Sequence, residues 1–213
     1  DRYEVLFIAD EIITGFGRTG RMFAMDHWGV VPDIIAFGKA ASSGYIPLGG
    51  VVISDKIRQV FSDGGEPFAH VFTYVNNPVA MRVCGTVLDI IAEEGVIEHV
   101  VEMGEYLAER AEGFKQYACV GDVRSKGLMM GIELVRDKQT KTPFAAEEGM
   151  SARGMSLALA RGLHISGVPG VADLVRGDDL RFYPPLVITR EQLGETLDII
   201  DEVLGKLTRE AGL

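Results

Sequence analysis

Three short apolar runs, each ending at a polar or glycine-rich segment, constrain the fold of this chain more than any other feature. The runs are Val5–Ala9, Ile34–Phe37 and Gly50–Ser54. A short run that is apolar throughout is typical of a strand buried on both faces in a parallel sheet. Asp10 follows the first run directly, and Gly38-Lys39 follows the second. The sequence therefore predicts an α/β sheet near the N-terminus, with polar side chains at the ends of its strands.

The remainder of the chain predicts helices and a hairpin separated by turns. Asn76 or Asn77 is placed to cap a helix that has Pro78 in its first turn and runs through Ala92, and Gly95 ends the pattern. The elements expected after Gly95 are a helix over 96–116, a hairpin over 123–135 with its turn near Lys126-Gly127, a helix over 147–161, a strand over 180–182 and a helix over 190–206 capped by Thr189. We expect residues 1–93 to belong to a larger α/β domain with a mostly parallel sheet, and residues 94–213 to form a smaller α+β domain.

Composition excludes several classes of function. The 31 acidic residues outnumber the 21 basic ones, and the formal net charge is −10. This charge disfavours binding to nucleic acid or to an anionic membrane, and no apolar run approaches the roughly 20 residues that span a bilayer. Cys84 and Cys119 lack metal-ligand spacing and are too few for a disulfide framework. We expect no metal site and a reducing, cytoplasmic setting.

A glycine motif suggests a nucleotide site that the neighbouring residues disfavour. Gly15-Phe16-Gly17-Arg18-Thr19-Gly20 matches the dinucleotide-binding pattern G-x-G-x-x-G after a predicted strand. Asp10 and Glu11 would repel a pyrophosphate there, and the aromatic, irregular segment 21–28 does not continue as the amphipathic helix that the pattern requires. The motif is better interpreted as a loop that its glycines permit.

Polar side chains at strand ends are the best candidates for chemistry. Asp10, Lys39 and Thr73 all lie at or beyond such ends, and ligands of open α/β sheets bind at the carboxyl ends of the strands. A lysine amine in surroundings that disfavour its charged form is a usable nucleophile toward an aldehyde. By position alone, however, Lys39 is better interpreted as a lysine that simply reaches solvent.

Several segments, in a fixed order along essentially the whole chain, resemble the signature of the class-III aminotransferases, which depend on pyridoxal phosphate. The segments are Asp10-Glu11-Ile12-Ile13-Thr14-Gly15-Phe16-Gly17-Arg18-Thr19-Gly20, Pro32-Asp33-Ile34, Gly38-Lys39-Ala40, Gly44-Tyr45-Ile46-Pro47-Leu48-Gly49, Phe72-Thr73-Tyr74 with Asn77-Pro78, the hairpin 121–133 and Leu180-Arg181-Phe182-Tyr183-Pro184-Pro185-Leu186. The resemblance implies a fold-type-I architecture, of which this chain would be the C-terminal portion.

The resemblance assigns the cofactor site to four residues. Lys39 would form the internal aldimine with pyridoxal phosphate and move a proton during the reaction. Asp10 would keep the pyridine nitrogen protonated, because an opposite charge within hydrogen-bonding distance favours the charged form. Ile12 would pack on one face of the ring, although it fits a plain core position nearly as well. Thr73 would donate its hydroxyl to the cofactor phosphate, in this family across the interface of a homodimer.

Arg181 occupies the family position for an arginine that binds the substrate carboxylate in a bidentate pair. Amine-type members of the family carry a mobile arginine farther upstream, and the matching segment 162–167 of this chain contains none. This difference favours a fixed carboxylate-binding role for Arg181. Arg176 is a weaker candidate because it lies in a polar loop, and His164 is better interpreted as a structural histidine.

The expected reaction moves an amino group from an amino acid or ω-amino acid to a 2-oxo acid such as pyruvate or 2-oxoglutarate. Decarboxylation and amino migration within one molecule remain alternatives in the same family. The first residue is Asp1 rather than Met, and the phosphate-binding Gly-Ser loop of the family's upstream part is not found. We therefore expect an incomplete chain, a split enzyme with a separate second half, or a non-catalytic fragment, in that order.

Overall fold

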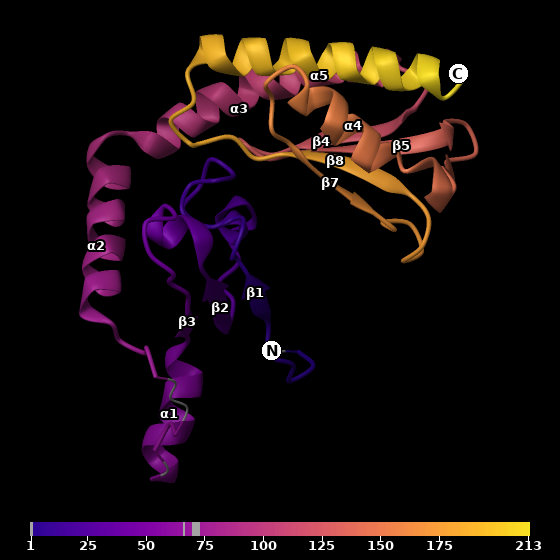
Figure 1. The fold of residues 1–213 in the computed structure, drawn as a ribbon. Coiled ribbons are helices and arrows are strands. Elements are labelled where there is room, and N and C mark those ends of the chain that lie inside the picture. The colour runs from indigo at the N-terminus through magenta and orange to yellow at the C-terminus, as the bar shows by residue number, and fades with distance from the viewer. Residues whose placement is uncertain (1, 66, 70–72) are drawn as a thin grey trace. The chain divides into compact units, whose positions relative to one another are not determined.

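The computed structural model describes residues 2–65, 67–69 and 73–213, and it divides the chain into two compact units, Asp1–Glu98 and His99–Leu213 (Figure 1). Phe72 of the motif Phe72-Thr73-Tyr74 lies outside the described residues. No helix in the described part of the chain is both long and apolar enough to cross a membrane.

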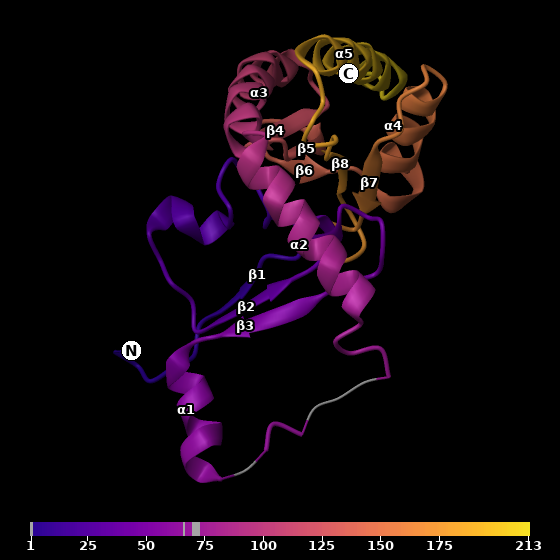
Figure 2. The same ribbon diagram turned by 90° about the vertical axis from the view of Figure 1, so that its left-hand side faces the viewer.

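The first unit is built on a three-stranded sheet in the order β1-β2-β3 (Figure 2). Its elements are β1 (Ile8–Asp10), the 3-10 helix η1 (Ala24–Trp28), β2 (Ile34–Phe37), the 3-10 helix η2 (Lys39–Ser42), β3 (Gly50–Ile53), α1 (Asp55–Gly64) and α2 (Pro78–Glu93). β1 and β2 are parallel, whereas β3 returns antiparallel to β2. The carboxyl ends of β1 and β2 therefore share one edge of the sheet with the start of β3.

The expectation of a first strand over Val5–Ala9, buried on both faces, is wrong in its bounds and in its burial. β1 covers Ile8–Asp10, and the side chain of Ile8 is 59% exposed. β1 pairs only with β2 among the described strands, so one of its edges is open. The apolar run indicates a strand. Whether the strand is buried depends on which other elements pack against it, and the residues of the run alone do not determine that.

The helix cap before α2 is confirmed as predicted. The Asn77 side chain accepts hydrogen bonds from the backbone N–H groups of Val79 and Ala80 at 3.0 and 3.2 Å, and Pro78 occupies the first turn. These bonds satisfy donors that would otherwise lack partners at the helix start. α2 packs against η2, the short helix that begins at Lys39.

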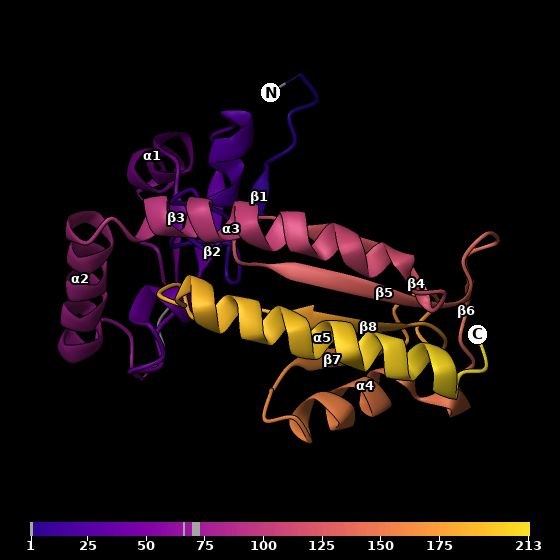
Figure 3. The same cartoon turned by 90° about the horizontal axis from the view of Figure 1, so that it is seen from above.

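The second unit is an antiparallel sheet with helices on one face. The strands run in the order β4-β5-β8-β7, and β6 pairs with β5. The elements are α3 (Val96–Glu112), the 3-10 helix η3 (Gly113–Gln116), β4 (Val120–Ser125), β5 (Met130–Asp137), β6 (Thr142–Pro143), the 3-10 helix η4 (Ala146–Glu148), α4 (Met150–Leu159), β7 (Ser166–Pro169), β8 (Asp178–Phe182) and α5 (Arg190–Glu210). α3, α4 and α5 cover the same face of the sheet (Figures 1 and 3).

The core of the second unit lies between that face and the helices. Strand residues such as Met130, Ile132 and Leu180 are 1% exposed, and Leu197 and Leu204 of α5 are fully buried. Side chains alternate between the faces of a strand, so Gly131 and Arg181 lie on the opposite, uncovered face. The predicted hairpin is confirmed, since β4 and β5 pair antiparallel across a turn closed by Lys126 N–H and the Met129 carbonyl at 2.9 Å.

Candidate functional site

The glycine motif after β1 forms a turn-rich loop, which agrees with its interpretation as a loop. No α-helix begins within residues 15–20, and the following helix is the short η1. Glu11 is only 2% exposed and accepts hydrogen bonds from the N–H groups of Ala24 and Met25 at 3.0 and 2.9 Å, as well as from the Thr14 hydroxyl. Glu11 therefore binds residues on both sides of the glycine motif, Thr14 before it and Ala24 and Met25 after it.

Asp10, Ile12 and Lys39 all lie at or just after the ends of strands that finish at the same edge of the first sheet. Asp10 ends β1 in register with Ala36 of β2, and Lys39 lies three residues beyond Ala36. The Ile12 side chain lies against the turn before the lysine, because a Cβ atom added to Gly38 would be 3.7 Å from Ile12 Cγ2. The parallel pairing of β1 and β2 thus brings together two residues 29 positions apart, Asp10 and Lys39.

Lys39 has an uncommon backbone conformation. Its φ angle is 42°, close to the left-handed region that is sparsely populated by residues other than glycine. Such a conformation costs of order 1–3 kcal/mol and is found most often at active sites and ligand-binding turns. The side chain is exposed at the sheet edge, so its amine is accessible to a ligand.

These three residues fit pyridoxal phosphate. Oδ1 of Asp10 accepts the Ile12 backbone N–H at 3.0 Å, which fixes the carboxylate. Among the contacts of the described residues, none occupies the other oxygen, so it is available to a pyridinium N–H. Ile12 is 37% exposed and offers an apolar surface beside the lysine. The arrangement supplies a carboxylate, an amine and an apolar contact at one edge.

Thr73 is the fourth residue that the resemblance assigns to the cofactor site. It lies in the turn 73–76 that leads into α2, and its side chain is exposed. No contact among the described residues links it to Asp10, Ile12 or Lys39. Its role toward the cofactor phosphate stays a prediction.

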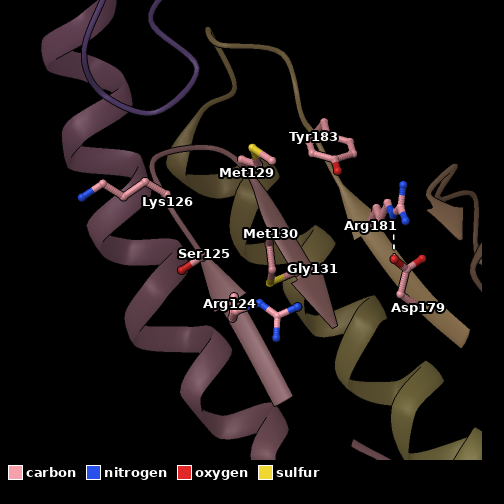
Figure 4. A pocket seen from close by; sticks show the side chains of 9 residues that line it. All are labelled: Arg124, Ser125, Lys126, Met129, Met130, Gly131, Asp179, Arg181 and Tyr183. Carbon is pink, nitrogen blue, oxygen red and sulfur yellow. Dashed lines mark hydrogen bonds and ion pairs between the residues drawn. The ribbon is translucent and has the colours of Figure 1, made fainter. Parts of the chain in front are cut away.

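Arg181 lies in the second unit, on the uncovered face of β8. Its Nε donates to Oδ2 of Asp179 at 2.7 Å, and Oδ1 of Asp179 accepts the backbone N–H of Val168 on β7 at 2.8 Å. Arg181, Asp179 and Gly131 are among the residues that line a hollow of about 300 Å³ in this unit (Figure 4). The hydrogen bond from Nε to Asp179 thus fixes the position of the guanidinium.

Arg124 lies on the other side of the same hollow, and its terminal nitrogens are both engaged. They donate to Oε1 of Glu133 at 2.5 Å and to Oδ2 of Asp122 at 2.8 Å. Hydrogen bonding to Glu133 and then to Asp122 raises the pKa of Arg124 above its usual value, and the same bond to Arg124 lowers the pKa of Asp122. Arg124 is therefore a structural arginine in this arrangement.

Two residues of the site were not identified from the sequence. Glu11 follows Asp10 but is buried in the loop, and Asp179 stands two positions before Arg181 on the same strand. Residues i and i+2 of a strand share a face, so the acidic residue next to Arg181 was a signal that could have been recognised. For Glu11 no comparable sequence signal exists.

Comparison with known proteins identifies one family. The family model "Aminotransferase class-III" matches residues 1–204. The putrescine–pyruvate aminotransferase of Pseudomonas aeruginosa is 38% identical over 204 residues, which are 95% of this chain and 42% of that protein. The mitochondrial gamma-aminobutyrate transaminase 1 of Oryza sativa subsp. indica is 35% identical over 98% of this chain and 39% of its own length.

A solved structure shows the same fold. The taurine:2-oxoglutarate aminotransferase from Bifidobacterium kashiwanohense, in complex with pyridoxal phosphate and glutamate, is 32% identical with a TM-score of 0.88, over 98% of this chain and 46% of that one. The chain thus spans less than half the length of these three proteins. The expected partial fold-type-I architecture and the expected cofactor, pyridoxal phosphate, are both confirmed. With a family model that covers nearly all of its residues, the chain belongs to the class-III aminotransferases.

Proposed function

We propose that the protein transfers an amino group from an amino acid or ω-amino acid to a 2-oxo acid, with Lys39 as the residue that carries pyridoxal phosphate. The donor leaves as a carbonyl compound, and the acceptor, such as pyruvate or 2-oxoglutarate, leaves as an amino acid. The observation that carries the proposal is the placement of Lys39, in its strained backbone conformation, at the same sheet edge as Asp10 and Ile12.

Each of the three residues has a task that its surroundings support. Pyridoxal phosphate, when bound, supplies an electron-withdrawing ring that stabilises negative charge at the substrate carbon. The Asp10 carboxylate, oriented by the Ile12 N–H, would accept a hydrogen bond from the ring nitrogen and keep it protonated. Ile12 would exclude water from one side of the ring. Nζ of Lys39 would hold the cofactor and would take the proton from Cα of the amino donor.

Arg181 supports a substrate that contains a carboxylate. A guanidinium binds a carboxylate through two parallel N–H···O bonds, which orient the substrate as well as hold it. Arg181 is half-buried and fixed at Nε by Asp179, and in the described part of the chain no contact engages its terminal nitrogens. A donor or acceptor with a carboxylate is therefore expected to be preferred over a simple amine.

The decisive experiment replaces Lys39 by Ala in the complete protein supplied with pyridoxal phosphate. We expect the native protein to show the visible absorbance of covalently held cofactor, and borohydride reduction to leave a cofactor adduct on the peptide that contains Lys39. Lys39→Ala should lose both signals and amino transfer. Lys56→Ala, a change of the same kind on α1 of the same unit, is the matched control and should retain all three.

The outcomes distinguish the aminotransferase from a decarboxylase and from a non-catalytic protein. Persistence of the adduct and of turnover in Lys39→Ala would exclude Lys39 as the attachment residue. Release of carbon dioxide without amino transfer by the native protein would instead point to the decarboxylases of the family. Failure of the complete native protein to bind the cofactor would support a non-catalytic role.

We further expect a homodimer in which the Thr73 hydroxyl contacts the cofactor phosphate of the partner, in a reducing, cytoplasmic setting. The exposure of Thr73 and the two unpaired cysteines support these expectations. Sedimentation equilibrium of the complete protein tests the dimer, and a monomer with full cofactor affinity would contradict it. Cell fractionation tests the compartment.

A further inference from the structure

The hollow beside Arg181 owes its shape to a glycine. Arg124 of β4, Gly131 of β5 and Arg181 of β8 are paired in register across three strands. Met130 and Ile132, on either side of the glycine, are buried in the core, so position 131 faces the uncovered side of the sheet with both arginines. Figure 4 shows Gly131 on the strand between the two arginines.

The missing side chain leaves open space between the arginines. A Cβ atom added to Gly131 would meet no heavy atom within 4 Å, and its backbone is not in the left-handed region that favours glycine. Neither backbone conformation nor packing within this unit therefore requires a glycine at this position. The space next to the guanidinium is the feature that a larger residue would change.

The two arginines differ in what they offer to an anion. Arg124 already donates both terminal nitrogens to carboxylates of its own strand pair. Among the contacts of the described residues, Arg181 is engaged only at Nε, by Asp179, whose side chain is 14% exposed. The other carboxylate oxygen of Asp179 accepts a hydrogen bond from the Val168 N–H. An anion in the hollow would thus bind the terminal nitrogens of Arg181, with Arg124 as the opposite wall.

We propose that Gly131 is a specificity-determining residue, because the space above it receives the carboxylate that Arg181 binds. Asp179 is the positioning residue that holds the guanidinium toward this space. The inference rests on the proposed carboxylate-binding role of Arg181 and adds to it the place where the carboxylate lies. A methyl group at position 131 would occupy that place without altering the core.

The test uses pentanoate as an unreactive carboxylate and butylamine as an amine without one, with binding to the cofactor-loaded complete protein measured by titration calorimetry. Gly131→Ala should raise the dissociation constant for pentanoate about tenfold, the effect of weakening one hydrogen-bonded charge contact. Binding of butylamine and the thermal unfolding midpoint should not change. Gly113→Ala, at a glycine of the same unit that also has nothing within 4 Å of an added Cβ, is the matched control and should leave pentanoate binding unchanged.

Arg181→Ala distinguishes failure of this inference from failure of the proposed function. If Arg181→Ala weakens pentanoate binding and Gly131→Ala does not, the carboxylate lies elsewhere around Arg181 and the role of Gly131 is refuted. If Arg181→Ala itself leaves pentanoate binding intact, the carboxylate-binding role of Arg181 is wrong. An equal loss in Gly113→Ala and Gly131→Ala would also overturn the inference, since the effect would then not be local.

Discussion

At the end of β1, two consecutive carboxylates face different surroundings. Asp10 is exposed at the sheet edge and is fixed by the Ile12 N–H, whereas Glu11 is buried and binds the loop and the start of η1. Side chains of consecutive strand residues point to opposite faces, so one acidic pair supplies both a ligand contact and a structural contact. The loop geometry around the site therefore depends on Glu11 as much as on the glycines.

A close contact of two glycines gives a prediction at the scale of single residues. An added Cβ at Gly104 of α3 would lie 2.7 Å from Cα of Gly127, which has a φ of 54° in the hairpin turn. Gly→Ala inside a helix ordinarily stabilises by about 1 kcal/mol, but a clash with backbone typically costs about 1–3 kcal/mol. Gly104→Ala should therefore lower the midpoint of thermal unfolding.

The matched change is Gly85→Ala in the interior of α2, where an added Cβ meets nothing within 4 Å. It should leave the midpoint unchanged or raise it. The same stabilisation in both variants would show that α3 does not approach the hairpin as closely as the structure has it.

Among the elements, the connection between β7 and β8 contains a turn that one aspartate stabilises together with backbone hydrogen bonds. Asp173 accepts hydrogen bonds from the N–H groups of Val175 and Arg176 and from Nε of Arg176. The bonded residues lie on either side of Leu174 in the chain. Leu174 has a φ of 69°, which is uncommon for a bulky residue, and it is 95% exposed. The carboxylate thus stabilises a strained turn that apolar packing does not support.

Removal of this carboxylate should loosen the turn. Hydrogen bonds from Arg176 and Val175 lower the pKa of Asp173 from its ordinary value of 3.8 to about 2. The stabilisation is therefore complete above about pH 4 and is lost as the pH falls through 2. Asp173→Asn should accelerate amide hydrogen exchange across 170–177 at neutral pH. Asp137→Asn, at a similar turn closed by Gln139 and Thr140, should leave exchange at 170–177 unaltered.

At the scale of the whole molecule, the two units differ in the core that each contains. The large buried cluster runs from Val100 to Leu207 and belongs to the second unit. In the first unit, apolar strand residues such as Val51 and Val52 are 60% and 53% exposed. The two aminotransferases from Pseudomonas aeruginosa and Oryza sativa are more than twice as long as this chain, and exposed apolar surface of this kind is typical of a site of protein contact.

The difference predicts how the units behave when produced separately. Residues 99–213 should fold alone, with dispersed amide resonances and a cooperative thermal transition, because their core is self-contained. Residues 1–98 should give collapsed resonances or associate with concentration. Cooperative unfolding of a monomeric 1–98 fragment would contradict this reasoning, and so would a disordered 99–213 fragment.

Local sequence was enough to predict most of the helices and strands, and the resemblance to the family named the residues that we propose to carry its chemistry. The Asn77 and Thr189 caps form as predicted because capping is a local interaction within three residues. Lys39, Asp10 and Arg181 were identified by their order along the chain, which resembles that of the family. Helix caps and family motifs both lie within short segments, so they can be recognised in the sequence.

The surroundings of those residues follow from the three-dimensional fold. The exposure of β1, the buried position of Glu11 and the space over Gly131 depend on how segments distant in sequence are arranged. A local pattern indicates whether a residue favours burial or a turn. Contacts across strands depend on the register and direction of the strands, and these are determined by the whole fold.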